Sequence, residues 1–477
     1  MINENIKYYD YVVVGAGIGG LMFTYRIHKK NPNKKILIIE QGKLLEKRKC
    51  PIIENKIKKC ANCSTCAIMS GFAGAGAFSD AKFNITTEYG GWINEYIDDK
   101  LALYYMEELD RILIKLNDID DNFNKTYKIY EPNILLKKKA LENDLHLLSG
   151  RVRHFGTDGI RIIMDILEEE ILNSQNITYL DSTIITPQNI NINEKIISIN
   201  ENNINYDKLI MAVGRSGSEM FKKFCEEWNI ETEHNQIDIG VRVEVPRLIC
   251  KEIAEKIYEP KIKYLTKKHR DIVRTFCFND GGEVVTENTN GILTVNGHAN
   301  SYEMKKTDNS NFAILSTHKF TEPFNEPIEY LNSVAKLGNM LGGNAIIAQL
   351  FGDLMDGRRS TYKRINEGTI KPTLKSYSPG DLSLVLPSAV IDNIVEMLYQ
   401  LDKFMPGVAN HDTILYGVEA KHYSCRPKFS NKDLFEIIPK NIYAIGDGAG
   451  VSRSLSQAGA MGLYLADKLS DNEEIKK

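Results

Sequence analysis

The chain has 477 residues, and 60 Lys and Arg against 63 Asp and Glu give a net charge of −3. An apolar fraction of 43% with 26% charged residues is typical of a globular chain and excludes a disordered one. The near-neutral charge argues against a nucleic-acid partner, because no positive field would release counterions from phosphates. The longest apolar run, Val12–Phe23, is broken by glycines and too short to span a membrane, and the polar start lacks a signal peptide's apolar stretch. We therefore expect a cytoplasmic protein without a membrane or nucleic-acid partner.

The chain opens with a strand–helix–strand pattern. Apolar runs predict strands over Asp10–Val14 and Ile36–Ile39, and the residues from Gly17 to Lys30 predict a helix between them. The turn reads Gly15-Ala-Gly17-Ile-Gly19-Gly20, a G-x-G-x-x-G motif at 15, 17 and 20. In a dinucleotide site the first glycine allows the tight turn, the second admits the pyrophosphate, and the third lets helix and strand pack closely. Backbone N–H groups at the helix start then face the phosphates.

Glu40 ends the second strand twenty residues after Gly20, where a carboxylate accepts hydrogen bonds from a ribose and repels a 2′-phosphate. With both strands, the helix and Glu40 in place, the opening of the chain predicts a dinucleotide-binding domain.

The middle of the chain is less regular. Helical periodicity covers 95–117 and 157–174, short alternating strands over 177–211 predict a β-meander, and 237–320 is strand-rich, with its clearest strand at Asp238–Val245. Helices return over 328–340 and 388–403. Residues 441–468 then repeat the opening order of strand, glycine turn and helix, which indicates one nucleotide-binding domain interrupted by another.

The C-terminal motif distinguishes between dinucleotides. The strand from Asn441 delivers Gly446 and Asp447 to a glycine turn, and a helix follows from Leu455. This resembles the second FAD signature of the glutathione-reductase-like flavoproteins, in which the Asp binds the ribityl–phosphate region. Leu209-Ile-Met-Ala212-Val-Gly214 similarly resembles the motif that precedes the substrate domain in that superfamily. The resemblance implies FAD, and the positive end of the helix from Leu455 would stabilise negative charge on the flavin ring.

Further motifs resemble a poorly characterised family of FAD-dependent dehydrogenases, often described only as NAD(P)/FAD-dependent oxidoreductases. The resemblance runs from end to end, although Ala81 stands where the family pattern has glycine, and it implies a flavin fold and redox chemistry without a substrate. The motifs that carry it are Ser70–Lys82, Asp238–Glu244, Val273–Cys277, Val295–His298, Gly357–Thr361 and Tyr416–Glu419.

The glycine-rich segment over 71–76 is rich in small residues, which let a backbone pass against a bulky planar ligand. Gly74 and Gly76 are therefore candidate cofactor-binding residues, although a flexible loop would have the same composition. Lys82 could reach the flavin N1/O2 edge or a phosphate, and a solvated lysine is the alternative. The full set of cofactor-binding residues is Gly15, Gly17, Gly19, Gly20, Glu40, Gly74, Gly76, Lys82, Gly214, Gly446, Asp447 and Leu455.

Four cysteines cluster ahead of that segment. Cys60, Cys63 and Cys66 form a C-x2-C-x2-C run, and Cys50 lies ten residues upstream. Three thiolates at this spacing can bind three corners of a [4Fe–4S] cluster, with Cys50 as the fourth ligand, although ferredoxin runs place the proline-linked cysteine after the triplet. Zinc, a dithiol that exchanges electrons with the flavin, and unligated thiols are the alternatives. The basic residues around the cluster, Arg48 among them, would stabilise thiolates.

Candidates for chemistry lie in the strand-rich region. His298, Arg274 and Tyr416 are the predicted catalytic residues, and Glu419 and His422 lie near the last of them. His298 could donate a proton, although a structural histidine would fit the same position. Arg274 needs a buried anion, either a substrate carboxylate or, as the preferred alternative, a structural one such as Glu244.

We predict an α/β fold, in which a β-rich α+β substrate domain is inserted in a discontinuous Rossmann-like FAD domain. The expected FAD segments are 1–90, 146–235 and 416–477, with a helical insertion at 91–145 and the substrate domain at 236–415.

The expected activity is that of an FAD-dependent oxidoreductase that passes hydride between flavin N5 and a small organic substrate, by C=C reduction or dehydrogenation. Electrons would come through a cysteine-held iron–sulfur centre or from a transient NAD(P)H co-substrate. The alternatives are an electron-transfer iron–sulfur flavoprotein, with ferredoxin or another protein as partner, and a non-redox flavoprotein (a hydratase, an isomerase or an RNA-modifying enzyme).

Overall fold

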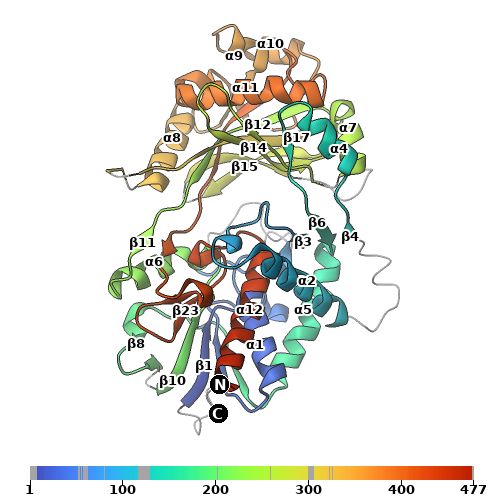
Figure 1. Ribbon diagram of the computed structural model, residues 1–477. Helices are drawn as coiled ribbons and strands as arrows, with labels where there is room; N and C mark the ends of the chain where they lie inside the picture. Colours follow the sequence, from blue (N-terminus) through green and yellow to red (C-terminus); the bar gives the residue numbers. More distant parts are fainter. Residues whose placement is uncertain are drawn as a thin grey trace. The chain divides into compact units, whose positions relative to one another are not determined.

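A computed structural model describes residues 8–51, 54, 56, 63–79, 81–116, 129–200, 202–257, 259–289, 291–298, 306–321, 323–324 and 326–474. The chain divides into two compact units. Unit 1 takes in 1–131, 150–233 and 424–477, and unit 2 takes in 132–149 and 234–423 (Figure 1).

Unit 1 is built on a mainly parallel sheet. Its central strands β10, β1 and β2 pair in parallel, with β23 parallel to β10 and β7 parallel to β2. Their side chains are buried on both faces, which explains the continuous apolar runs in the sequence. The strands are β22 (Glu436–Ile437), β23 (Ile442–Ala444), β10 (Asn202–Met211), β1 (Tyr8–Val14), β2 (Ile36–Ile39) and β7 (Ile177–Leu180). In addition, β9 (Ile196–Ile199) pairs antiparallel with β10, and β8 (Ile190–Asn191) pairs antiparallel with β9.

Helices complete unit 1. Helices α1 and α12 pack closely, because Gly462 has no side chain where a Cβ would lie 2.1 Å from the backbone oxygen of Gly19 (Figure 1). The helices are α1 (Ile18–Lys30), α2 (Asp99–Leu116), α5 (Gly156–Leu172), α6 (Ser218–Glu227) and α12 (Leu455–Glu474). Smaller sheets join β3 (Lys82–Ile85), β6 (Arg151–His154) and β4 (Ile129–Tyr130), and β11 (Thr232–Glu233) with β21 (Arg426–Pro427).

Unit 2 is built on a second, mainly antiparallel sheet. Strand β12 lies between β17 and β20, and the core of the unit packs against these strands. In sheet order the strands are β19 (Tyr377–Pro379), β18 (Ile346–Leu350), β20 (Ile414–Lys421), β12 (Ile237–Pro246), β17 (Asn309–His318), β14 (Ile272–Asn279), β13 (Ile262–Leu265) and β5 (His146–Leu147), and β15 (Glu283–Thr289) forms a hairpin with β16 (Ile292–His298).

The helices of unit 2 come from both of its chain segments. Helix α11 contacts β12 and β17 and buries an apolar face that includes Ile394, Met397 and Leu401. The helices are α4 (Ile134–Leu141), α7 (Arg247–Lys256), α8 (Pro327–Leu341), α9 (Phe351–Met355), α10 (Tyr362–Glu367) and α11 (Ser388–Phe404).

The predicted α/β class is confirmed: a parallel-sheet unit made of separate chain segments is interrupted by a unit built on an antiparallel sheet. Two expectations were wrong. Residues 177–211 are not one meander, because β7 pairs in parallel with β2 and only β8, β9 and β10 are antiparallel neighbours. The boundary expected at 415/416 also differs, because β20 pairs with β12 and β18 and thus belongs to unit 2.

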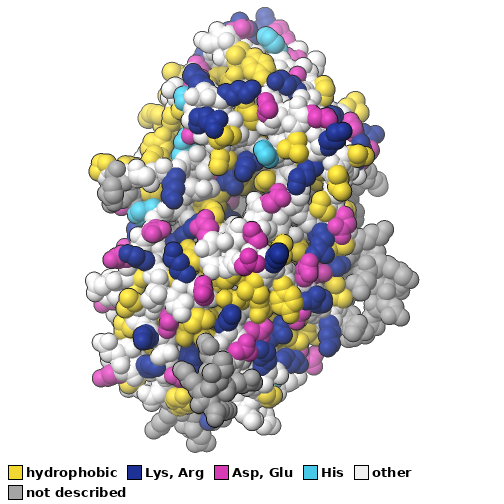
Figure 2. All heavy atoms as spheres, viewed as in Figure 1, with side chains coloured by type: hydrophobic (Ala, Val, Ile, Leu, Met, Phe, Trp, Pro, Cys, Tyr) yellow, Lys and Arg dark blue, Asp and Glu magenta, His cyan; other side chains and the backbone are white. Residues whose placement is uncertain are grey.

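The expected helical insertion at 91–145 is likewise divided. Helix α2 belongs to unit 1, whereas residues 132–149 join unit 2 because β5 pairs with β13. Among the helices that the structure describes, none combines the length and apolar character that a membrane crossing requires. On the face drawn in Figure 2, basic and acidic side chains are interspersed, in keeping with the near-zero net charge.

Candidate functional site

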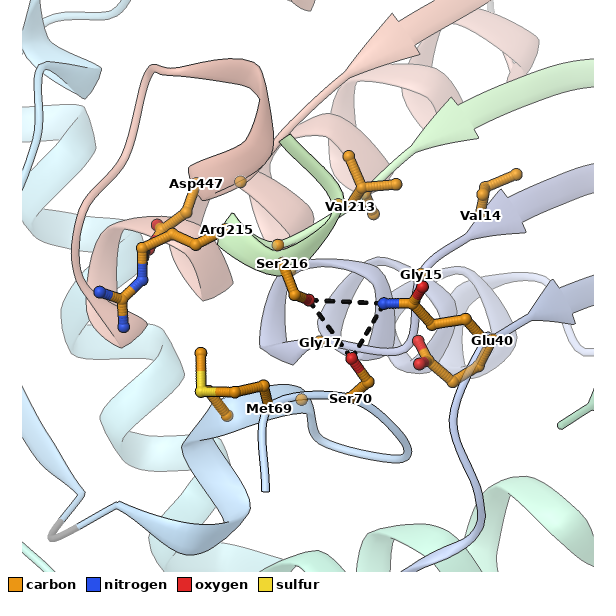
Figure 3. Close-up of a pocket in the computed structure, with 18 of the residues that line it drawn as sticks. Val14, Gly15, Gly17, Glu40, Met69, Ser70, Val213, Arg215, Ser216 and Asp447 are labelled. Atoms are coloured by element: carbon orange, nitrogen blue, oxygen red, sulfur yellow. Dashed lines mark hydrogen bonds and ion pairs between the residues drawn. The ribbon is translucent and has the colours of Figure 1, made fainter. Parts of the chain in front are cut away.

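A cavity opens in unit 1 at the carboxyl ends of β1, β2 and β10 (Figure 3). This is the edge at which parallel α/β sheets bind ligands. Its wall is formed by the turn after β1, the residues after β2, the segment 69–76, the residues after β10, and the start of α12.

The glycines of the first turn divide into those that face the cavity and those that allow packing. Gly15 has φ +105°, and a Cβ there would lie 2.6 Å from the backbone oxygen of Ala212. A Cβ on Gly20 would lie 2.2 Å from the backbone oxygen of Gly15, so Gly20 allows α1 to pack on the strand. Gly17 lines the cavity, and apart from its chain neighbours no described residue places an atom within 4 Å of the position a Cβ would take. A ligand can therefore approach the backbone at Gly17.

The start of α1 is an anion-binding feature. Gly17 caps the helix without a side-chain hydrogen bond, and the first turn holds no acidic residue. Unsatisfied N–H groups and the positive end of the helix dipole therefore face the cavity. Gly74 approaches from the opposite segment, because a Cβ there would lie 3.3 Å from the Cα of Gly17.

The buried carboxylate of Glu40 connects three loops. It accepts hydrogen bonds from the backbone N–H groups of Ala16, Gly42 and Gly71, each at 2.9 Å. Burial raises the pKa of Glu40, although the three hydrogen bonds and the charge of Arg48 act in the opposite direction. Within the part of the chain that the structure describes, Oε2 accepts the bond from Ala16 alone, which leaves one lone pair for a ligand hydroxyl.

Arg48 holds the segment 69–76 in place. Its guanidinium donates to the backbone oxygens of Ala67, Ile68, Phe72 and Gly74 at 2.6–2.8 Å, and it lies over the Phe78 ring. Burial lowers the pKa of Arg48 to about 10. Carbonyl oxygens take four of its N–H donors, so the hydrogen bonds of Arg48 serve this segment, whereas the expected stabilisation of thiolates by the basic residues around the cluster stays a prediction.

Polar side chains from three segments meet above the start of α1. The Gln41 amide donates to Ser70 Oγ at 2.9 Å and to Ser216 Oγ at 3.5 Å, and the two serine oxygens are 3.4 Å apart (Figure 3). Their donors and acceptors can rearrange toward a polar ligand, because each group can rotate to change partner.

Asp447 and Arg215 lie to one side of this polar cluster (Figure 3). Asp447 accepts a hydrogen bond from Ser452 Oγ at 2.6 Å, and Arg215 Nε is 3.8 Å from its other carboxylate oxygen. Helix α12 begins at Leu455, and its start faces the cavity through Ser454, Leu455 and Ala458.

The structure brings ten of the twelve predicted cofactor-binding residues into this one cavity. Gly20 and Lys82 are not among its lining residues: Gly20 packs α1, and Lys82 lies half-buried on β3 opposite His154. The ten are Gly15, Gly17, Gly19, Glu40, Gly74, Gly76, Gly214, Gly446, Asp447 and Leu455.

Sequence reasoning missed several lining residues, including Gln41, Met69, Arg215 and Ser216. Their positions offered a signal, because Gln41 follows Glu40 directly and Arg215 follows the Leu209–Gly214 motif. No pattern pointed to Thr183–Ile185, which β7 delivers to the cavity.

Ala81 has a left-handed backbone, with φ +51°. Glycine adopts this conformation without strain, which explains why the family pattern has glycine at this position.

The cysteine cluster is only partly described, since Cys60 lies outside the described residues. Cys63 and Cys66 are exposed and Cys50 is half-buried. In the part of the chain that the structure describes, no three His, Cys, Asp or Glu side chains gather to hold a metal ion. The metal site at Cys50, Cys60, Cys63 and Cys66 stays a prediction.

The three catalytic candidates lie in unit 2, and two of them have protein partners. Arg274 pairs with Asp238 at 3.1 Å, so the preferred structural carboxylate is confirmed, but the suggested partner, Glu244, was wrong. Tyr416 donates to Glu244 at 2.5 Å, and burial together with that carboxylate raises the pKa of Tyr416 well above its ordinary value. Tyr416 therefore keeps its proton at neutral pH.

Strand register explains the partner of Arg274. Asp238 lies opposite Thr317 and Arg274 opposite Leu315, two residues apart on β17, so both side chains share one face. Glu244 lies opposite Asn311, roughly 13 Å further along the strand from Leu315 at about 3.3 Å per residue.

His298 is exposed at the end of β16. The residue before it, Gly297, lies against a buried ion pair of Arg242 and Glu419, whose Nη2 and Oε1 are 2.7 Å apart. Glu419 is thus a structural partner, and His422 is exposed.

The comparisons with known proteins come from sequence and from structure. Residues 236–422 match the model of one family, described as FAD-dependent protein, C-terminal domain-like. This stretch lies within unit 2, outside the residues that line the cavity. Over 98% of its length the chain is 26% identical to an uncharacterized protein of Clostridium beijerinckii, of which 81% is covered. The resemblance to FAD-dependent proteins is thus supported over unit 2.

Solved structures show weaker likeness. A quinol fumarate reductase of E. coli is 12% identical, with a TM-score of 0.42 over 98% of this chain and 71% of that one. An L-proline dehydrogenase of P. horikoshii is 12% identical, with a TM-score of 0.39 over 98% and 94%. A glycine oxidase of Bacillus cereus is 10% identical, with a TM-score of 0.37 over 97% and 95%. At these scores the likeness carries no argument about function.

Proposed function

We propose that this chain binds FAD in the cavity of unit 1 and is an oxidoreductase that passes hydride between flavin N5 and a small organic substrate, by C=C reduction or dehydrogenation. The observation that carries the proposal is the open backbone at Gly17 beneath the uncapped start of α1, in the cavity that also holds Glu40 and Asp447. The family match supports the same cofactor from residues that do not line the cavity.

The lining residues suit the diphosphate, a ribose and the ribityl chain of FAD. The start of α1 would hold the diphosphate, the free lone pair of Glu40 would accept a ribose hydroxyl, and Asp447 would face the ribityl region that the resemblance assigns to it. Bound FAD supplies hydride and electron transfer. The start of α12 places a positive dipole end at the cavity, which favours an anionic ligand group there.

Substrate handling falls to unit 2 in this proposal. Tyr416 holds its proton toward Glu244 and Arg274 is paired with Asp238, so both support the sheet rather than present a free group. His298 is the remaining candidate for a proton donor, because its ring is exposed.

The test is the cofactor content of the full chain, purified without oxygen. We expect one FAD per chain, released on denaturation and identified by chromatography, and bleaching of the bound flavin by NADH or NADPH if a nicotinamide is the direct donor. A flavin-free chain that fails to bind added FAD would reject the proposal. Turnover in which the substrate is neither oxidised nor reduced overall would favour a non-redox role.

A second candidate function is electron transfer through a cysteine-held centre to ferredoxin or another protein. It is favoured by one contact: the backbone oxygen of Cys66 accepts hydrogen bonds from Met69 and Ser70, which line the cavity. Metal and sulfide analysis of the same sample decides it. Roughly four irons and four sulfides per flavin would support a cluster, whereas one zinc or no metal would remove the electron-transfer function.

A further inference from the structure

The cavity has an uneven balance of charge for a ligand with a diphosphate. Two of its lining residues are carboxylates, Glu40 and Asp447. Among the described residues that line it, Arg215 is the one with a cationic side chain. The positive ends of α1 and α12 contribute roughly half a positive charge each, and Arg48 acts on Glu40 from outside the lining residues. Together these charges do not offset two acidic side chains and two phosphate charges, so a cation among the lining residues would favour binding of the diphosphate.

Arg215 is placed to move toward such a ligand. Its side chain is 51% exposed, and its nearest ionic partner is the Asp447 carboxylate at 3.8 Å, beyond hydrogen-bond distance (Figure 3). In contrast, the guanidinium of Arg48 is fixed by four carbonyl oxygens. A contact of this kind with Asp447 contributes little to folding, so Arg215 can change partner at low cost.

The neighbouring backbone directs Arg215 to the same cavity as the start of α1. Arg215 follows Gly214 at the end of β10, and Gly214, Arg215 and Ser216 all line the cavity. Ser216 reaches Gln41 and Ser70 above the start of α1, so the segment that carries Arg215 spans the cavity from Asp447 to that point (Figure 3).

We propose that Arg215 is the cation that pairs with the diphosphate of FAD, exchanging its contact with Asp447 for a charged hydrogen bond to a phosphate oxygen. This inference rests on the proposed function. Arg215 would thereby hold the diphosphate against the start of α1 and offset the repulsion between the phosphates and the two carboxylates of the cavity.

The test compares Arg215→Met with a matched control, Lys222→Met, in the full chain after removal of flavin. Lys222 on α6 is 49% exposed and lies 3.8 Å from Glu226, so it matches Arg215 in exposure and in its ionic contact, and it does not line the cavity. FAD, ADP, adenosine and riboflavin are titrated against each protein, at low and at moderate salt.

We expect Arg215→Met to lower the affinities for FAD and for ADP by a similar factor, about 10- to 100-fold, because one charged hydrogen bond is lost. Adenosine and riboflavin, which lack phosphate, should bind as they do to the wild type. Arg215→Lys should retain most of the affinity for FAD and ADP because it keeps the charge. Lys222→Met should leave the affinities for all four ligands unchanged. The salt dependence of ADP binding should also fall in Arg215→Met.

Two outcomes would overturn the inference. Unchanged FAD and ADP affinities in Arg215→Met would show that no phosphate depends on Arg215. A loss shared by adenosine or riboflavin, or a lower thermal stability of the flavin-free variant, would assign Arg215 a structural role instead. Failure of the wild type to bind FAD would reject the proposed function itself, so the two failures are distinguishable.

Discussion

Replacing Arg48 with methionine tests whether one buried cation holds the wall of the cavity. Methionine keeps an unbranched apolar chain but removes every donor. Four hydrogen bonds to backbone oxygens are lost, and each is worth about 2 kcal/mol because its donor is charged. The variant also recovers the cost of burying the charge. Burial lowers the pKa of Arg48 from 12.5 to about 10, which corresponds to about 3 kcal/mol.

The difference leaves a destabilisation of about 5 kcal/mol, a value typical of the removal of one partner from a buried charged network. Urea unfolding of the flavin-free chain measures it, with Arg111→Met as the control. Arg111 is 56% exposed and pairs with Glu108 on its own helix, so its replacement should cost less than about 1 kcal/mol.

The effect of Arg48→Met on FAD binding shows whether Arg48 holds the cavity wall or only stabilises the core. If Arg48 fixes the segment 69–76, then FAD should stabilise Arg48→Met less than it stabilises the wild type, because part of the binding energy is spent on ordering that segment. An Arg48→Met variant would refute this reasoning if its unfolding free energy lay within about 1 kcal/mol of the wild-type value and FAD stabilised both proteins equally.

Three further predictions concern the remaining features. Gly17→Ala should leave the unfolding free energy unchanged and weaken FAD binding at least tenfold, because the added Cβ would enter only the cavity. Gly20→Ala should instead destabilise the flavin-free chain by about 2 kcal/mol or more, because its Cβ would lie 2.2 Å from a backbone oxygen. Burial raises the pKa of Glu40 above its unfolded value of 4.5, so its ionisation costs stability as pH rises through the folded-state pKa. The unfolding free energy of the wild type minus that of Glu40→Gln should therefore fall as pH rises above 4.5, and a difference that rises instead would contradict this sign. Glu419→Gln leaves Arg242 buried without its carboxylate and should lower the unfolding free energy in urea by about 3–5 kcal/mol. A loss of less than about 1 kcal/mol would mean that the other hydrogen-bond partners of Arg242 stabilise its charge without Glu419.

The sequence alone determined the local units of the cavity. The turn at Gly15–Gly20, the strand that ends at Glu40 and the motif around Asp447 are contiguous patterns, and strands of a parallel sheet bring their carboxyl ends to one edge. Ten of the twelve predicted residues therefore meet there.

Only the tertiary structure decided which distant side chains meet. Arg274 pairs with Asp238 rather than Glu244 because of the register of β12 and β14 against β17, and sequence patterns do not specify register between strands far apart in the chain. Arg48 stands among lysines in the sequence, and its burial depends on how the segment 69–76 folds over it. Arg215 belongs to the cavity because β10 ends beside β1, a parallel pairing between strands almost two hundred residues apart.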